Sequence, residues 1–83
     1  MIYTPFYTTR IKKQIKLLGR RGYDMNLFKE VVEMLLDGVV LPAKYHDHPL
    51  YGDKRGYRDC HIQNDWVLIY KIDKSILYKF VYN

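Results

Sequence analysis

Hydrophobic residues recur at helical spacing in two segments of the N-terminal half of this 83-residue chain. In residues 10–19, isoleucine and leucine fall three or four positions apart, and lysines occupy the opposite face. A second apolar stripe covers residues 27–35 and ends at Gly38, with Asp24 or Asn26 available to cap its N-terminus. The pattern therefore predicts two consecutive amphipathic helices.

Segments rich in β-branched and aromatic residues lie on either side of the predicted helices. Ile2–Tyr7 predicts a short first strand. Residues 57–62, 66–72 and 76–82, separated by short polar turns, predict three strands of an antiparallel meander. The order strand, helix, helix, three strands indicates an α+β fold of one domain over residues 1–83, with both helices packed on one face of the sheet.

Between the helices and the meander, residues 39–56 contain two prolines and two glycines, which predicts an ordered surface loop. Such loops often carry function. In the strand that follows, alternation places Asp59 and His61 on one face and Cys60 on the other. The sequence therefore predicts that Cys60 is buried.

The charge balance favours a polyanionic partner. Fourteen Lys and Arg oppose nine Asp and Glu, so the net charge is +5, which suits nucleic acid or an acidic protein. The lysines of the first helix form either a solvated face or a contact with RNA. Cys60, the single cysteine, has no disulfide partner in the chain, which fits a reducing cytoplasm. No apolar stretch approaches the ~20 residues of a membrane span, so secretion and membrane insertion are not expected.

Three side chains in the loop and the first hairpin are able to take part in proton transfer: His48, His61 and Asp65. Two imidazoles facing one phosphate can remove the proton of a 2′-hydroxyl and protonate the leaving 5′-oxygen, which is metal-free RNA cleavage. The alternative is that these histidines are ordinary surface or hydrogen-bonding groups. Because His46 and His48 have no cysteine nearby, we expect neither a zinc site nor a cofactor.

Cations and aromatic rings surround these groups and match the way single-stranded RNA is commonly held. The residues predicted to bind RNA are Lys44, Lys54, Arg55, Arg58 and Trp66. For Trp66, at the start of a strand, burial in the core is an equal alternative to base stacking.

The segment from Leu41 to Ile72 resembles the signature of YafQ-type toxins, a branch of the RelE-like toxins. It contains Leu-Pro, then Asp-His-Pro-Leu, Gly-Tyr-Arg-Asp followed by Cys-His, and Asp-Trp before an apolar strand. The resemblance implies a ribosome-dependent endoribonuclease that cuts mRNA and is neutralised by an antitoxin of the DinJ or RelB type. It also implies catalytic roles for His48, His61 and Asp65.

The resemblance also points to a difference. Family members continue past the last strand with a Thr-Gly-(Ser/Thr)-His segment, whereas this sequence ends at Asn83, so we expect reduced nuclease activity of the 83-residue form. Two alternatives to a nuclease are a module that binds the ribosome or the antitoxin without cutting, and a ParE-like inhibitor of gyrase.

Overall fold

The computed structural model describes residues 1–63 and 65–82, with only the backbone described for residues 80–82. β3 (Arg58–Gln63), β4 (Trp66–Asp73) and β5 (Ile76–Tyr82) pair antiparallel in chain order. The predicted meander is therefore confirmed.

Two very short strands complete the sheet at its edges. β1 (Thr4–Pro5) pairs in parallel with β5, and β2 (His48–Pro49) pairs antiparallel with β3, so the order is β1-β5-β4-β3-β2. The predicted first strand, Ile2–Tyr7, is thus shorter than expected. The reason is that the amides of Ile2 and Tyr3 both donate to the carbonyl of Leu36 instead of pairing in the sheet.

The first helix, α1 (Thr9–Arg20), begins where the hydroxyl of Thr8 accepts a hydrogen bond from the amide of Ile11 at 3.1 Å. This contact satisfies one of the amides that a helix N-terminus leaves unpaired. α1 lies beside β5, and its residues Ile11 and Leu18 are buried.

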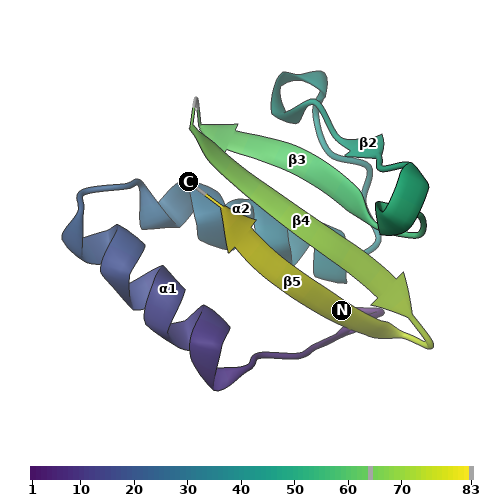
Figure 1. Ribbon diagram of the computed structural model, residues 1–83, viewed down its shortest axis with the longest axis horizontal. Coiled ribbons are helices and arrows are strands. Elements are labelled where there is room, and N and C mark those ends of the chain that lie inside the picture. The colour runs from purple at the N-terminus through teal and green to yellow at the C-terminus, as the bar shows by residue number, and fades with distance from the viewer. Residues whose placement is uncertain (64, 83) are drawn as a thin grey trace.

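The second helix, α2 (Met25–Leu36), is capped by Asp24, whose carboxylate accepts from the amides of Asn26 and Leu27. Both helices lie on the same side of the sheet, as predicted (Figure 1). Each has 12 residues, and no helix in the described part of the chain is long and apolar enough to cross a membrane.

The core lies between α2 and the face of the sheet that the helices cover, called here the inner face. Alternation along the strands places Cys60, Ile62, Trp66 and Leu68 on it, all between 0% and 5% exposed. The buried residues of α2 that pack in the same core are Phe28, Val31, Val32, Leu35 and Leu36. The opposite, outer face of β3 carries Asp59 and His61, as the sequence predicts.

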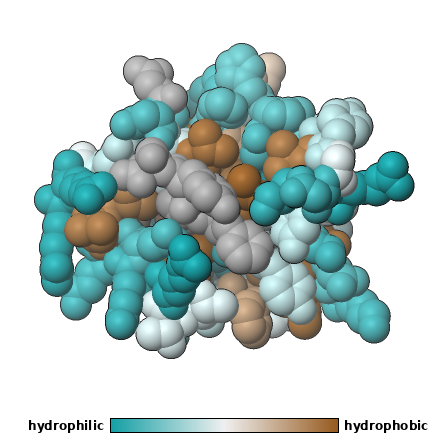
Figure 2. Space-filling view, in the orientation of Figure 1, coloured by the Kyte–Doolittle hydropathy of each residue, from teal (hydrophilic) through white to brown (hydrophobic). Residues whose placement is uncertain are grey.

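The predicted loop of residues 39–56 is ordered and includes short regular elements. It forms a 3₁₀ turn at Ala43–Tyr45, then β2, then a second 3₁₀ turn at Gly52–Lys54. Tyr45 is 2% exposed and anchors the loop in the core. The loop lies at the edge of the sheet opposite α1 (Figure 1). In the same orientation, hydrophilic side chains occupy most of the periphery of the molecule (Figure 2).

Candidate active site

The pairing of β2 with β3 brings the predicted histidines together on the outer face. His48 lies opposite Asp59, and His61 lies two residues further along β3, on the same face as Asp59. The ring centroids of His48 and His61 are 6.2 Å apart, and their planes are inclined by only 29°. Two of the three predicted catalytic groups are therefore neighbours.

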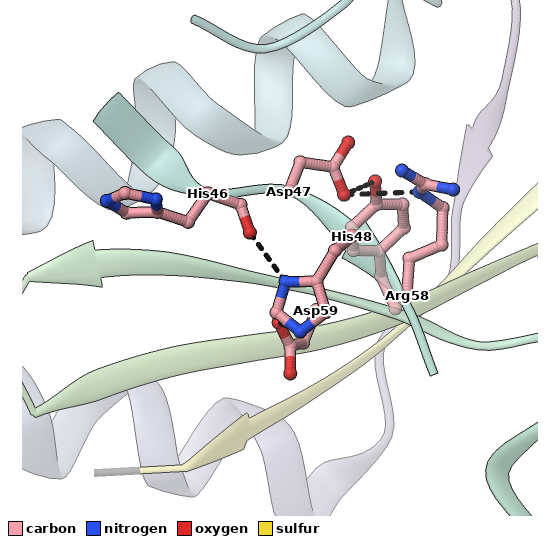
Figure 3. Close-up of polar contacts among 6 residues, drawn as sticks. His46, Asp47, His48, Arg58 and Asp59 are labelled. Atoms are coloured by element: carbon pink, nitrogen blue, oxygen red, sulfur yellow. Dashed lines mark hydrogen bonds and ion pairs between the residues drawn. The ribbon is translucent and has the colours of Figure 1, made fainter. Parts of the chain in front are cut away.

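Contacts on both ring nitrogens fix the orientation of His48, and Figure 3 shows the one to the His46 carbonyl. Nδ1 lies 2.7 Å from the carbonyl oxygen of His46, which only accepts hydrogen bonds, so Nδ1 is the donor. Nε2 lies 2.9 Å from Oδ1 of Asp59. Oδ1 is buried and has no aligned hydrogen-bond donor among the described residues, so Nε2 of His48 is the polar atom that faces it.

His61 differs from His48 in that its ring nitrogens have no hydrogen-bond partner within the described ranges. Its contacts are with other rings: His48, and His46 at 6.0 Å with an interplanar angle of 83°. His46 has a left-handed backbone, with φ of 50°. Three imidazoles thus gather over β3, and one of them, His48, is held by contacts on both ring nitrogens.

Asp47, between the two loop histidines, points toward the opposite side of the strand (Figure 3). Its Oδ1 accepts from the Tyr70 hydroxyl at 2.7 Å and from Arg58 Nε at 3.2 Å. Burial, followed by the hydrogen bond to Asp47, raises the pKa of Tyr70. Burial alone would lower the pKa of Arg58, but hydrogen bonds with Tyr70 and Asp47 outweigh burial and raise it, so the guanidinium stays charged.

The third predicted catalytic residue, Asp65, lies at the turn between β3 and β4. It is exposed, and its Oδ2 accepts a hydrogen bond from Tyr23 at 2.9 Å. Within the described residues, no contact joins it to a histidine. With Arg21, Gly22, Tyr23 and Gln63 it lines an open depression of about 250 Å³. The structure therefore does not bring Asp65 into contact with the histidine pair.

Trp66 requires a correction, because the structure buries it completely and leaves no face of its ring for an RNA base. It stacks on Phe28 at 5.5 Å with an interplanar angle of 6°, and Tyr23 packs against its edge. The physical reason is alternation along β4, which places Trp66 on the inner face under α2. The core alternative for this residue is confirmed.

Three of the predicted RNA-binding cations lie on the loop that carries His48, and the fourth, Arg58, begins β3, the strand that carries His61. Lys44, Lys54 and Arg55 are exposed, and none has an ion-pair partner in the part of the chain that the structure describes. Arg58 is partly engaged, since Asp47 binds its Nε while 43% of its side chain stays exposed.

Among the described residues, no group of three histidine, cysteine or acidic side chains is placed to hold a metal ion.

Sequence reasoning did not assign roles to His46, Asp47 or Asp59. A signal existed for Asp59, because alternation places it on the face of His61. No comparable signal identifies the pairing of His48 with Asp59, which depends on a two-residue strand that contains a proline.

Comparison with known proteins places this chain in a family. The family model described as "Bacterial toxin of type II toxin-antitoxin system, YafQ" matches residues 3–81. The mRNA interferase toxin YafQ of Escherichia coli K12 is 43% identical over 72 residues, which are 86% of this chain and 78% of that protein.

Solved structures agree. The crystal structure of the E. coli DinJ–YafQ complex matches with a TM-score of 0.80 at 39% identity, over 90% of this chain and 84% of that one. The crystal structure of a metal-bound toxin from Helicobacter pylori matches with a TM-score of 0.82 at 33% identity, over 95% and 89%. This chain therefore belongs to the YafQ family of toxins of type II toxin–antitoxin systems.

Proposed function

We propose that this toxin is an endoribonuclease that cleaves mRNA on the ribosome without a metal ion or cofactor. The observation that carries the proposal is the pair of histidines on the outer face, in which Asp59 holds His48 and His61 is left to accept a proton. The E. coli relative, named as an mRNA interferase toxin, supports the same reaction class. The family match also favours RNA over gyrase as the target.

In the proposed reaction, His61 accepts the proton of a 2′-hydroxyl while the 2′-oxygen attacks the adjacent phosphorus. His48 donates a proton to the 5′-oxygen as the bond from that oxygen to phosphorus breaks. The products are a 2′,3′-cyclic phosphate and a free 5′-hydroxyl, and water later returns both histidines to their starting states. Asp59 favours this division of roles because its carboxylate faces Nε2 of His48 rather than the ring of His61.

RNA binding is assigned to Lys44, Lys54, Arg55 and Arg58, which offer positive charge in the loop that carries His48 and at the start of β3. Contacts with phosphates depend on salt because they release counterions. Lys54→Ala together with Arg55→Ala should therefore weaken binding and flatten its salt dependence.

Asp65 remains part of the proposal as a catalytic residue. Its Oδ1 is not engaged by Tyr23, and the residue lies in the turn that follows the strand carrying His61. A carboxylate there can contact the substrate or orient a proton-transfer group that moves when RNA binds.

The partners we propose are mRNA on the ribosome and a cognate antitoxin. A similar toxin is found in complex with DinJ, and a chain of net charge +5 suits an acidic antitoxin segment that folds on binding. Both proposed partners support a location in the cytoplasm.

The test is single-turnover cleavage of mRNA on programmed ribosomes. His48→Ala and His61→Ala should each slow cleavage by about 10² to 10⁴, the usual contribution of one general acid or base, and leave ribosome binding largely unchanged. Glu30→Ala, a change on the exposed side of α2, serves as the control.

A substrate with 2′-deoxy substitution at the scissile nucleotide should not be cut, because it lacks the nucleophile. Cleavage of that substrate would overturn the mechanism. Ribosome binding by the unaltered protein with no cleavage of the RNA substrate would favour the non-cleaving binding module instead.

A further inference from the structure

Asp47 occupies an unusual position between His46 and His48. The side chain of His48 is 49% exposed, whereas that of Asp47 is 19% exposed. The same oxygen, Oδ1, receives hydrogen bonds from two donors, the Tyr70 hydroxyl and Arg58 Nε. Arg58 and Tyr70 lie opposite each other in the register of β3 and β4, so one carboxylate oxygen joins the loop to two strands.

The backbone alone provides little to hold this part of the loop. β2 has only two residues, and one of them, Pro49, has no amide hydrogen to donate. Beyond the two paired residues, the amide of Leu50 donates to the carbonyl of Tyr57 at 2.9 Å. The side chain of Asp47 therefore provides an attachment that the backbone cannot replace.

The position of the His48 ring depends on the backbone that Asp47 attaches. The hydrogen-bond acceptor of Nδ1 is the carbonyl of His46, a residue in the left-handed conformation. Non-glycine residues adopt this conformation at a cost, so surrounding contacts must hold it in place. A loop released from Arg58 and Tyr70 would relax at His46 and move the acceptor away from the ring.

We propose that Asp47 is a positioning residue that acts through its carboxylate bridge to Arg58 and Tyr70. It fixes the His46–His48 backbone so that the His48 ring lies between the His46 carbonyl and Asp59. Its effect on cleavage rests on the proposed function, whereas its effect on the ring does not. These two consequences are measured separately.

The first measurement requires no RNA. In nitrogen-resolved NMR spectra of the imidazole groups, the unaltered protein should show a His48 ring with hydrogen-bonded Nδ1. Asp47→Ala should shift the His48 signals toward those of a freely rotating imidazole, and Asp47→Asn, which keeps an acceptor oxygen, should restore them. An unchanged His48 spectrum in a folded Asp47→Ala protein would overturn the proposal whether or not the toxin cleaves RNA.

The second measurement is cleavage at saturating ribosome concentration. Asp47→Ala should lower the maximal rate by about 10- to 100-fold, because misplacing a catalytic group by about 1 Å has effects of this size. The ribosome concentration at half-saturation should change much less than the maximal rate, because Arg58 is the one proposed RNA-binding residue that loses a partner in Asp47→Ala. Loss of binding with an unchanged maximal rate would contradict a positioning role.

Two further variants separate positioning from general damage to the fold. Tyr70→Phe removes one donor to Asp47 and should lower the rate less than Asp47→Ala does, and adding it to Asp47→Ala should lower the rate no further. Asp73→Ala removes an exposed carboxylate at the far end of β4 and should change neither the rate nor the spectrum. Fully additive effects of Asp47→Ala and Tyr70→Phe would contradict the bridge.

Discussion

Cys60 and Ile62 on the inner face of β3 are buried under α2, whereas Asp59 and His61 on the outer face meet side chains from the loop. Neighbouring residues of one strand thus have opposite surroundings. On the inner face the contacts are apolar, and many side chains of similar size could fill the space. On the outer face each contact joins particular atoms, such as Nε2 of His48 and Oδ1 of Asp59. The comparison predicts that substitutions in the apolar contacts of the inner face change stability, and that substitutions among the polar side chains of the outer face change activity.

Trp66→Ala should produce the largest change in stability. It removes a fully buried ring that stacks on Phe28, so the free energy of unfolding should fall by about 3–5 kcal/mol. His61→Ala, on the outer face, should lower it by about 1 kcal/mol at most. Denaturant unfolding of both variants checks the contrast, and equal losses would remove the distinction between the two faces.

Lys79 is a charged residue on the largely apolar inner face, and its substitution should give the next largest change in stability. It is 4% exposed, its Nζ lies 3.8 Å from the centroid of the Tyr7 ring, and burial lowers its pKa to about 8. Below that pH the folded protein must keep a buried charge, which costs stability. Lys79→Met should therefore raise the free energy of unfolding by about 1–3 kcal/mol near pH 7.

The pH dependence of this variant provides the check. Between about pH 8 and pH 10 the unfolded chain binds the lysine proton more strongly than the folded one does, so the unaltered protein gains stability as pH rises. The advantage of Lys79→Met should shrink over that range. Cys60, whose pKa burial raises to about 12, has the opposite effect, but it is common to both proteins and cancels. An advantage independent of pH would contradict a charged Lys79.

Tyr23→Phe should have the smallest effect and tests whether the two ends of β3 are independent. It removes the hydroxyl that donates to Asp65, an exposed contact, so the loss should be about 0.5 kcal/mol. The imidazole NMR signals of His48 and His61 should not move. A shift in either ring would show that the turn carrying Asp65 is coupled to the histidine pair.

Much of the fold follows from the sequence, because the spacing of hydrophobic residues along the chain reflects which side chains are buried in the core. Both helices, the meander and the burial of Cys60 were predictable in this way. The length of the first strand was not, because it depends on hydrogen bonds between the N-terminal residues and the carbonyl of Leu36. Contacts between segments so distant in sequence leave no periodic pattern.

The site was predictable only in part, for a related reason. His48 and His61 were chosen for their chemistry, and the structure places them together. Asp47 and Asp59 acquire partners through the register of β2, and Trp66 has an aromatic ring that suits either RNA or a core. Which of these roles a side chain takes depends on tertiary contacts rather than on local sequence.

The parallel pairing of Thr4 with Ile76 has a consequence for folding during translation. Strands so far apart in the chain meet late, because the loop between them must close first. During translation, β1 cannot pair with β5 until β5 has left the exit tunnel of the ribosome. For a toxin proposed to act on ribosomes, the complete sheet therefore cannot form on the ribosome before β5 has emerged.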